Sequence, residues 1–237
     1  MFKKLLIPFI LLTPIAGHAE EASVNKWSGE AELGYLKTSG NTDTESLHAK
    51  GKLVNERKRW KHTATLEVTD KSDNGVTSAS RWYLTGKSDY KIDDLSYLFG
   101  TVSYENDDFS GYDYQITEVV GYGYHAIKKE DLKLDLEAGV GARQSKLSST
   151  GTSNSEGMIT GAANLEWVIS KTSTFTQLLS VEAGEDSTIS RSVTALKMQI
   201  VGNLSAKLSH SIKHSSDVPV GTEKKDTESV ITLVYNF

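Results

Sequence analysis

Alternation of apolar and polar residues with a period of two runs from Trp27 to the last residue, and it constrains the fold more than any other feature. In the clearest stretch, from Leu132 to Arg143, leucine, alanine and valine fall on one side and charged residues or glycine on the other. No window of helical length shows the apolar spacing of an amphipathic helix. The pattern predicts an all-β chain.

The alternation predicts twelve strands, and their connections fall into two classes. The strands are expected at about 26–37, 44–56, 59–70, 79–91, 94–105, 112–127, 131–145, 156–170, 173–184, 190–201, 203–215 and 226–237. Short links at 56–59, 91–94, 128–131, 170–173 and 202–203 alternate with longer Gly/Ser/Asp-rich links at 38–43, 70–78, 105–111, 146–155, 184–189 and 216–225. This layout is typical of a closed antiparallel transmembrane β-barrel with short periplasmic turns and longer extracellular loops.

A soluble β-sandwich or a lipocalin-like barrel would alternate in the same way. The expected strands are long enough to match the roughly 9–11 residues that cross a bilayer at a tilt, which favours the membrane barrel. The mean hydropathy of −0.36 is compatible with it, because half of each strand would face a polar interior.

Aromatic residues near the strand ends also favour a membrane barrel, because two aromatic belts anchor such barrels at the bilayer interfaces. The last strand ends on Phe237, which resembles the C-terminal signal read by the barrel assembly machinery. We therefore expect Phe237 to contact that machinery. The belts are expected to comprise Trp27, Trp60, Tyr90, Tyr122, Tyr124, Trp167, Phe175 and Tyr235 at the periplasmic rim, and Tyr35, Trp82, Tyr104, Tyr112 and Tyr114 at the outer rim.

Residues 1–19 have the pattern of a secretory signal peptide, with Lys3 and Lys4 before the apolar run Leu5–Leu12 and small residues at Gly17 and Ala19. The apolar run is shorter than the roughly 20 residues of a transmembrane helix. We expect cleavage after Ala19, export through the periplasm to the cell outer membrane, and one barrel domain over 20–237 with both termini in the periplasm.

Composition excludes several classes of function. The net charge of −5 argues against a nucleic-acid partner, because phosphate recognition needs a basic surface. The absence of cysteine excludes a disulfide scaffold, a thiol nucleophile, a cysteine-ligated zinc and an iron–sulfur cluster. No cofactor is expected.

A few residues fit the expected faces poorly. Glu118 would point outward with its apolar neighbours, so a bulge or a reversed register is expected in that strand. The strand at 94–105 has apolar residues on both faces and cannot be oriented. Gln177 and His210 are smaller misfits of the same kind.

The polar face would line a lumen in which charges of both signs interleave. A barrel of this size encloses at most a narrow passage. The lumen could be a conducting pore with a weak field or a salt-bridged plug, and the sequence does not choose between them. The inward residues are expected to be the acids Glu30, Glu32, Glu67, Asp89, Asp135, Glu137, Glu166, Glu182 and Glu228, and the bases Lys50, Lys52, Lys61, Arg81, Lys87, Lys133, Arg143, Arg191, Lys197, Lys207 and Lys213.

Candidates for catalysis are weak. Ser46 and His48 share a face two residues apart, but that spacing is about 7 Å, too far for a nucleophile and its base. His125 lies near a short link, and His210 with His214 lacks a carboxylate partner at a defined spacing. We assign no catalytic residue and no metal site.

Acidic residues cluster in the expected loops, where Glu105, Asp107 and Asp108 accompany Asp113, and Asp70 accompanies Asp73. They could gather divalent cations that bridge lipopolysaccharide, or they could be ordinary solvated residues. Thr38–Thr42 is expected to form a turn, because Gly40 and Asn41 tolerate positive φ angles.

Several motifs resemble those of the YdiY-like family of salt-induced outer-membrane proteins, whose domain has no assigned function. The resemblance spans essentially the whole mature chain and implies an outer-membrane β-barrel with a role in the response to salt or osmotic conditions. It implies no catalytic or binding residues. The motifs are Gly34-Tyr35 followed by Thr38–Thr42, Arg57 with Trp60, Arg81-Trp82-Tyr83, Tyr104–Asp113, and Gly139–Arg143.

The leading hypothesis is thus a monomeric barrel that forms a narrow channel for ions or small solutes, with outer-membrane lipid and lipopolysaccharide around it. A non-conducting structural or adhesive envelope protein acting through acidic loops is the alternative. An enzyme acting on envelope lipids comes third.

Overall fold

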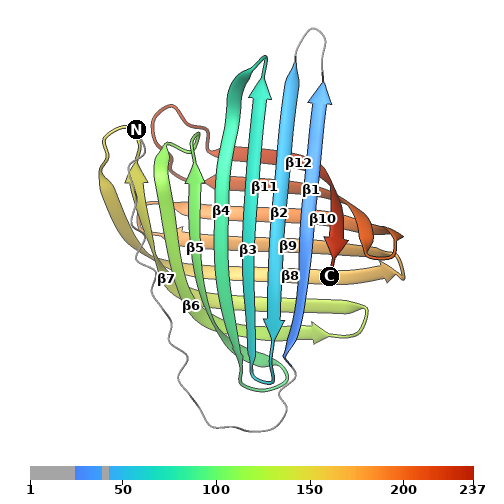
Figure 1. Ribbon diagram of the computed structural model, residues 1–237. Helices are drawn as coiled ribbons and strands as arrows, with labels where there is room; N and C mark the ends of the chain where they lie inside the picture. The colour runs from blue at the N-terminus through green and yellow to red at the C-terminus, as the bar shows by residue number, and fades with distance from the viewer. Residues whose placement is uncertain (1–24, 39–42) are drawn as a thin grey trace.

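Antiparallel strands close into a single barrel in the computed structural model, which describes residues 25–38 and 43–237. The expected signal peptide and residues 39–42 of the expected turn lie outside the described residues. Each strand pairs with its neighbours in sequence, and β1 pairs with β12 to close the barrel (Figure 1). The strands are β1 (Lys26–Thr38), β2 (Thr44–Glu56), β3 (Trp60–Asp73), β4 (Val76–Lys91), β5 (Ser96–Asp107), β6 (Tyr112–Lys128), β7 (Leu132–Leu147), β8 (Ser153–Ser170), β9 (Ser173–Gly184), β10 (Thr188–Val201), β11 (Leu204–Ser215) and β12 (Lys225–Asn236).

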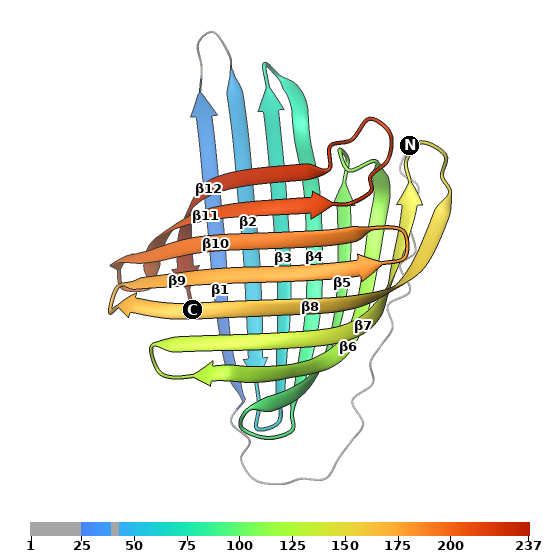
Figure 2. The same cartoon turned by 180° about the vertical axis from the view of Figure 1, so that it is seen from behind.

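The two walls of the barrel cross each other steeply. In Figures 1 and 2, β1–β4 run nearly vertically while β8–β11 run nearly horizontally on the other side. This crossing is expected in a closed barrel, because each strand tilts by about 35–45° from the barrel axis. The described residues contain no helix long and apolar enough to cross a membrane.

The two ends of the barrel differ as the sequence predicts, although strands extend further into the expected loops. The turn end carries links of two to four residues at 57–59, 92–95, 129–131, 171–172 and 202–203. The loop end includes 108–111, 148–152 and the longest described link, 216–224. The longer link expected at 184–189 is wrong, because β10 begins at Thr188 and leaves only 185–187 between the strands.

The prediction of a long loop at 70–78 is wrong. Strands β3 and β4 are joined by a two-residue turn in which Asn74 has φ 50° and Gly75 has φ 77°. Asn-Gly is the favoured pair for such a turn because both positions need positive φ.

At the turn end, backbone N–H groups of Leu95 and Ser96 donate to the Asp93 carboxylate, which holds the pKa of Asp93 below its ordinary value.

Apolar side chains cover the outside of the barrel and charged side chains fill the inside. Val140 and Ile231 are 58% and 73% exposed, whereas Arg143 is 2% exposed. This is the reverse of a soluble domain, and it is the arrangement of a barrel whose outer surface meets lipid. At the turn end, Trp27 and Tyr235 lie exposed on the outside, as expected for an aromatic belt.

The structure shows which face of β5 points into the lumen, a question that the sequence pattern left open. Tyr97, Phe99 and Glu105 are buried and point inward, while Leu98 and Val102 are exposed outside. The two aromatic rings lie over glycines of the neighbouring strand: a Cβ at Gly123 would lie 2.1 Å from the Tyr97 ring.

The irregularities expected in strand β6 are present, but they do not turn Glu118 inward. Glu118 is exposed on the outer face, paired with Val102 on one side. The irregularities of β6 lie nearer its ends. The register is fixed because Gly121 and Gly123 must face inward to leave room for the rings of β5.

Gly123→Ala is expected to lower the free energy of unfolding by about 1–3 kcal/mol, because the added methyl displaces the Tyr97 ring. Urea unfolding in vesicles would measure it. Gly51→Ala is the matched control, since no atom lies within 4 Å of the added carbon. Equal stabilities of the two variants would contradict the packing described for Tyr97.

Candidate functional site: a charged lumen

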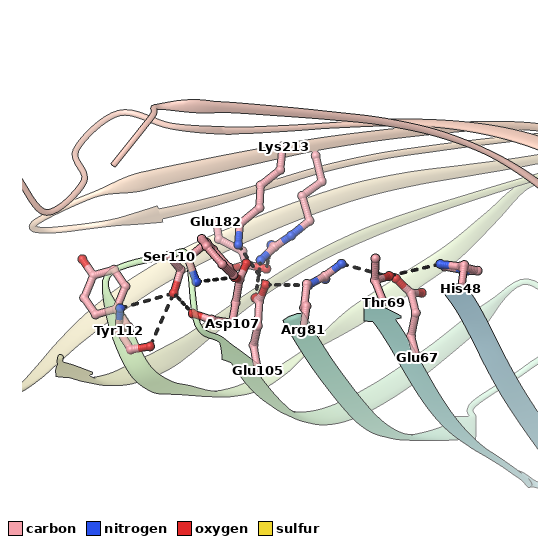
Figure 3. Close-up of polar contacts among 12 residues, drawn as sticks. His48, Glu67, Thr69, Arg81, Glu105, Asp107, Ser110, Tyr112, Glu182 and Lys213 are labelled. Atoms are coloured by element: carbon pink, nitrogen blue, oxygen red, sulfur yellow. Dashed lines mark hydrogen bonds and ion pairs between the residues drawn. The ribbon is translucent and has the colours of Figure 1, made fainter. Parts of the chain in front are cut away.

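The lumen is the candidate site, and its most connected part lies near the loop end. We call this group the loop-end cluster. Its side chains come from inward positions of strands on both walls, and Figure 3 shows much of it. The cluster comprises Lys50, Glu67, Arg81, Glu105, Arg143, Glu156, Glu182, Arg191 and Lys213.

Glu105 on β5 is the centre of the loop-end cluster. Its Oε1 lies 2.9 Å from Lys213 Nζ on β11 and 3.0 Å from Arg81 Nε on β4. Its Oε2 lies 3.5 Å from an Nη atom of Arg191 on β10. Strands β5 and β11 lie opposite each other in the closed order, so these ion pairs cross the lumen (Figure 3).

Further ion pairs extend the cluster along both walls. Arg191 Nη1 lies 2.7 Å from Glu182, and Arg143 pairs with Glu182 at 3.7 Å and with Glu156 at 2.7 Å. On the other wall, Arg81 also contacts Glu67 at 3.3 Å. The result is a chain of alternating charges that runs from one wall to the other and narrows the lumen.

The assignment of Glu105 to the acidic loops is therefore wrong. Strand β5 continues to Asp107, so Glu105 keeps the inward parity of Phe99 and is only 5% exposed. The alternation within β5 could have revealed this, had the strand been oriented. Glu156 and Lys71 are two further luminal charges that the sequence analysis missed.

The remaining loop acids do not form a metal site. Asp113 pairs with Lys146 at 2.8 Å, and Asp73 accepts a hydrogen bond from Thr44. Within residues 25–38 and 43–237, no group of three or more His, Asp or Glu residues could hold a metal ion.

A cavity of about 190 Å³ lies in the turn-end half of the lumen, and we call it the turn-end chamber. The Tyr97 hydroxyl donates to Glu137 at 2.6 Å, and His125 Nδ1 lies 2.6 Å from Asp135. Lys87 contacts Glu137 and lies 5.5 Å from the centre of the Tyr97 ring. The chamber has room for several water molecules and offers them polar partners of both signs.

The catalytic candidates do not form a catalytic arrangement. His48 is buried and its Nδ1 lies 3.2 Å from the Thr69 hydroxyl, so its hydrogen-bond partner is Thr69 rather than Ser46. His125 faces inward to Asp135, on the face opposite the exposed Tyr124. His210 faces outward and pairs with Ser229 at 2.8 Å.

Residues 31–237 match the family described as protein of unknown function, DUF481. The chain belongs to this family. It is 27% identical over 224 residues to the uncharacterized protein YdiY of Escherichia coli K12, covering 92% of this chain and 86% of YdiY. The sequence-based resemblance to the YdiY-like family is thus confirmed.

Solved outer-membrane channels share the fold of this DUF481 protein. The NanC porin superposes with a TM-score of 0.55 at 12% identity, covering 87% of this chain and 98% of the porin. An outer-membrane channel of Pseudomonas putida F1 also superposes with a TM-score of 0.55, at 13% identity. The match covers 94% of this chain and 99% of that channel. These neighbours are porins and channels rather than enzymes, and they confirm the fold of an outer-membrane β-barrel.

Proposed function

We propose that this DUF481 protein lies in the outer membrane and forms a narrow channel for ions and small charged solutes. The observation that carries the proposal is the ion-pair chain of the loop-end cluster, which spans the lumen above a polar chamber. Permeating ions can exchange with the paired side chains, because most charges of the cluster, Glu105 and Arg191 among them, contact more than one partner. The same cluster leaves little room for larger molecules.

The channel is expected to respond to salt. Exposed charges interact over a Debye length of about 10 Å at 0.1 M salt and about 3 Å at 1 M. Ions that enter the lumen weaken pairs such as Lys50–Glu67, whose side chains are partly exposed. Salt would therefore loosen the constriction, which agrees with the salt response implied by the family resemblance.

We further propose how the chain reaches the outer membrane and is arranged there. Residues 1–19 would direct export and be removed, and residues 20–237 would form one monomeric barrel surrounded by lipid and lipopolysaccharide. Phe237 exchanges two backbone hydrogen bonds with Gly29, at 2.8 and 3.0 Å, and so joins the barrel closure. A C-terminal aromatic read by the assembly machinery would thus be positioned where the barrel is completed.

Vesicle swelling with solutes of graded size tests the proposal. Vesicles containing the protein are expected to swell in potassium chloride and glycine but not in a trisaccharide. Glu182→Gln should admit larger solutes, because it removes the charge that Arg143 and Arg191 both contact and so weakens the constriction. The matched control is Glu166→Gln, which removes a half-exposed ion pair with Lys133 at the turn end. Vesicles that swell in no solute would contradict the channel.

A further inference from the structure

The junction between the first and last strands is the shortest in the barrel. It consists of the pairs from Glu30↔Asn236 to Leu33↔Leu233, extended by the backbone bonds between Gly29 and Phe237. Each other junction has at least eleven residue pairs. In Figures 1 and 2, β1 and β2 continue together beyond the point where β12 bends away to follow β11.

Beyond this junction, the facing edges of β1 and β12 separate and have no strand partner among the described residues. Strand β1 continues to Thr38, and β12 begins at Lys225, yet the described pairing ends at Leu33 and Leu233. The strands are still close at Gly34, where a Cβ would lie 2.7 Å from the Ile231 carbonyl oxygen. We call the unpaired stretch beyond Gly34 the seam.

The seam lies at the depth of the membrane. A tilted strand crosses the hydrocarbon in about 9–11 residues, and counting from Trp27 at the turn end places residues 34–37 within that span. Unpaired backbone groups are not tolerated in hydrocarbon unless they are buried in protein or line a water-filled cavity. Protein does not bury the seam, because Tyr35 and Leu36 are 62% and 58% exposed. We therefore infer that luminal water reaches it.

The seam is lined by an ion pair and one leucine on the luminal side and by apolar side chains on the outer side. Leu36 lies on the luminal face of β1 and is 58% exposed, whereas His48, on the luminal face of the neighbouring strand, is 8% exposed. On the inner side, Lys71 of β3 and Glu228 of β12 lie 2.8 Å apart. On the outer side, Ile231 is exposed.

A row of polar side chains begins beside the seam and crosses the outward face. His210 pairs with Ser229, and the Thr194 hydroxyl donates to Gln177 at 2.6 Å. Thr194 and His210 are register partners, so the four residues form one line across β9–β12. This row accounts for Gln177 and His210, the two misfits of the sequence analysis.

We propose that the seam is a lateral portal through which a single-chain amphipathic molecule with a zwitterionic headgroup passes between the lumen and the outer leaflet. The headgroup carries both signs, as does the Lys71–Glu228 pair that it would meet. The acyl chain would lie between Leu36 and Ile231. Outside the seam, the polar row offers hydrogen-bond partners to the headgroup. The inference rests on the proposed membrane location but does not require ion conduction.

Closing the seam chemically tests the portal. If the register continued, Leu36 would face Val230 as a non-hydrogen-bonded pair, because both lie seven residues from the hydrogen-bonded pair Gly29↔Phe237. Such pairs have Cα atoms about 4.5 Å apart. The full chain has no cysteine, so Leu36→Cys with Val230→Cys can be joined by a short bifunctional thiol reagent without side reactions.

The probe is lysophosphatidylcholine with a photoreactive group in its acyl chain, added to phospholipid vesicles that contain the protein. We expect labelling at luminal positions beside the seam, such as Ser46 and Lys71, in three proteins. These are the wild type, the untreated cysteine variant and the Leu36→Ser/Val230→Ser control. The joined variant should lose luminal labelling and keep labelling at the outward-facing Leu66. Because joining follows folding, a folding defect would appear equally in the untreated variant.

Luminal labelling that is absent from wild type, or unchanged in the joined variant, would overturn the portal. A disulfide-linked dimer of Lys37→Cys would also overturn it, because a second copy would then occupy the free edge of β1. Ion conduction without luminal labelling would reject the portal alone. Luminal labelling in a protein that passes no ions would reject the channel and support the portal.

Discussion

Glu105→Gln is expected to raise the single-channel conductance and to shift the reversal potential toward that of the anion in a salt gradient. The substitution keeps the side-chain volume but removes the charge that Arg81, Arg191 and Lys213 share. Three cationic groups would then share the section of the lumen that the loop-end cluster crosses. Lumen charges of this kind set selectivity in membrane barrels.

Planar-bilayer recording under a potassium chloride gradient measures both effects. Glu166→Gln is the matched control, because its partner Lys133 is half exposed at the turn end and lies outside the loop-end cluster. The control should keep the wild-type reversal potential. A Glu105→Gln channel with wild-type conductance and selectivity would place the limiting section elsewhere.

Arg143→Met is expected to lower the free energy of unfolding by about 3–5 kcal/mol, because it leaves the carboxylate of Glu156 buried without its cationic partner. Arg143 is 2% exposed and also donates to the carbonyl and hydroxyl of Ser187, so it ties three strands and a loop together. Urea unfolding of the refolded protein would measure the loss.

Two controls separate burial from charge. Lys133→Met removes an exposed ion pair and should cost about 0–1 kcal/mol. Adding Glu156→Gln to Arg143→Met should recover part of the stability, because the uncompensated charge is then gone. A double variant less stable than Arg143→Met would show that the buried carboxylate has other essential partners.

The strand pattern could be predicted because each strand separates a polar lumen from an apolar outer surface. The prediction fails where a strand carries apolar side chains on its luminal face as well. Strand β5 carries Tyr97 and Phe99 on its luminal face, where glycines of β6 make room for them, so both of its faces look apolar in sequence. Its unknown orientation then led to the wrong placement of Glu105 in a loop.

The contacts that make the candidate site depend on barrel geometry that local patterns do not contain. Glu105 and Lys213 are 108 residues apart in sequence and meet because strand tilt and closure bring opposite walls together. The seam depends in the same way on where β12 leaves β1. By contrast, the turn at Asn74-Gly75 carried a strong local signal and could have been predicted.

Single-channel recording of the wild-type protein in a planar bilayer, at two salt concentrations and under a salt gradient, shows whether the lumen conducts ions. We expect discrete steps of small conductance that rises more steeply with salt than the conductivity of the bulk solution does, and a reversal potential close to zero. An inserted, folded barrel that stays silent at both concentrations would contradict the proposed channel, and would mean that the ion pairs around Glu105 form a plug.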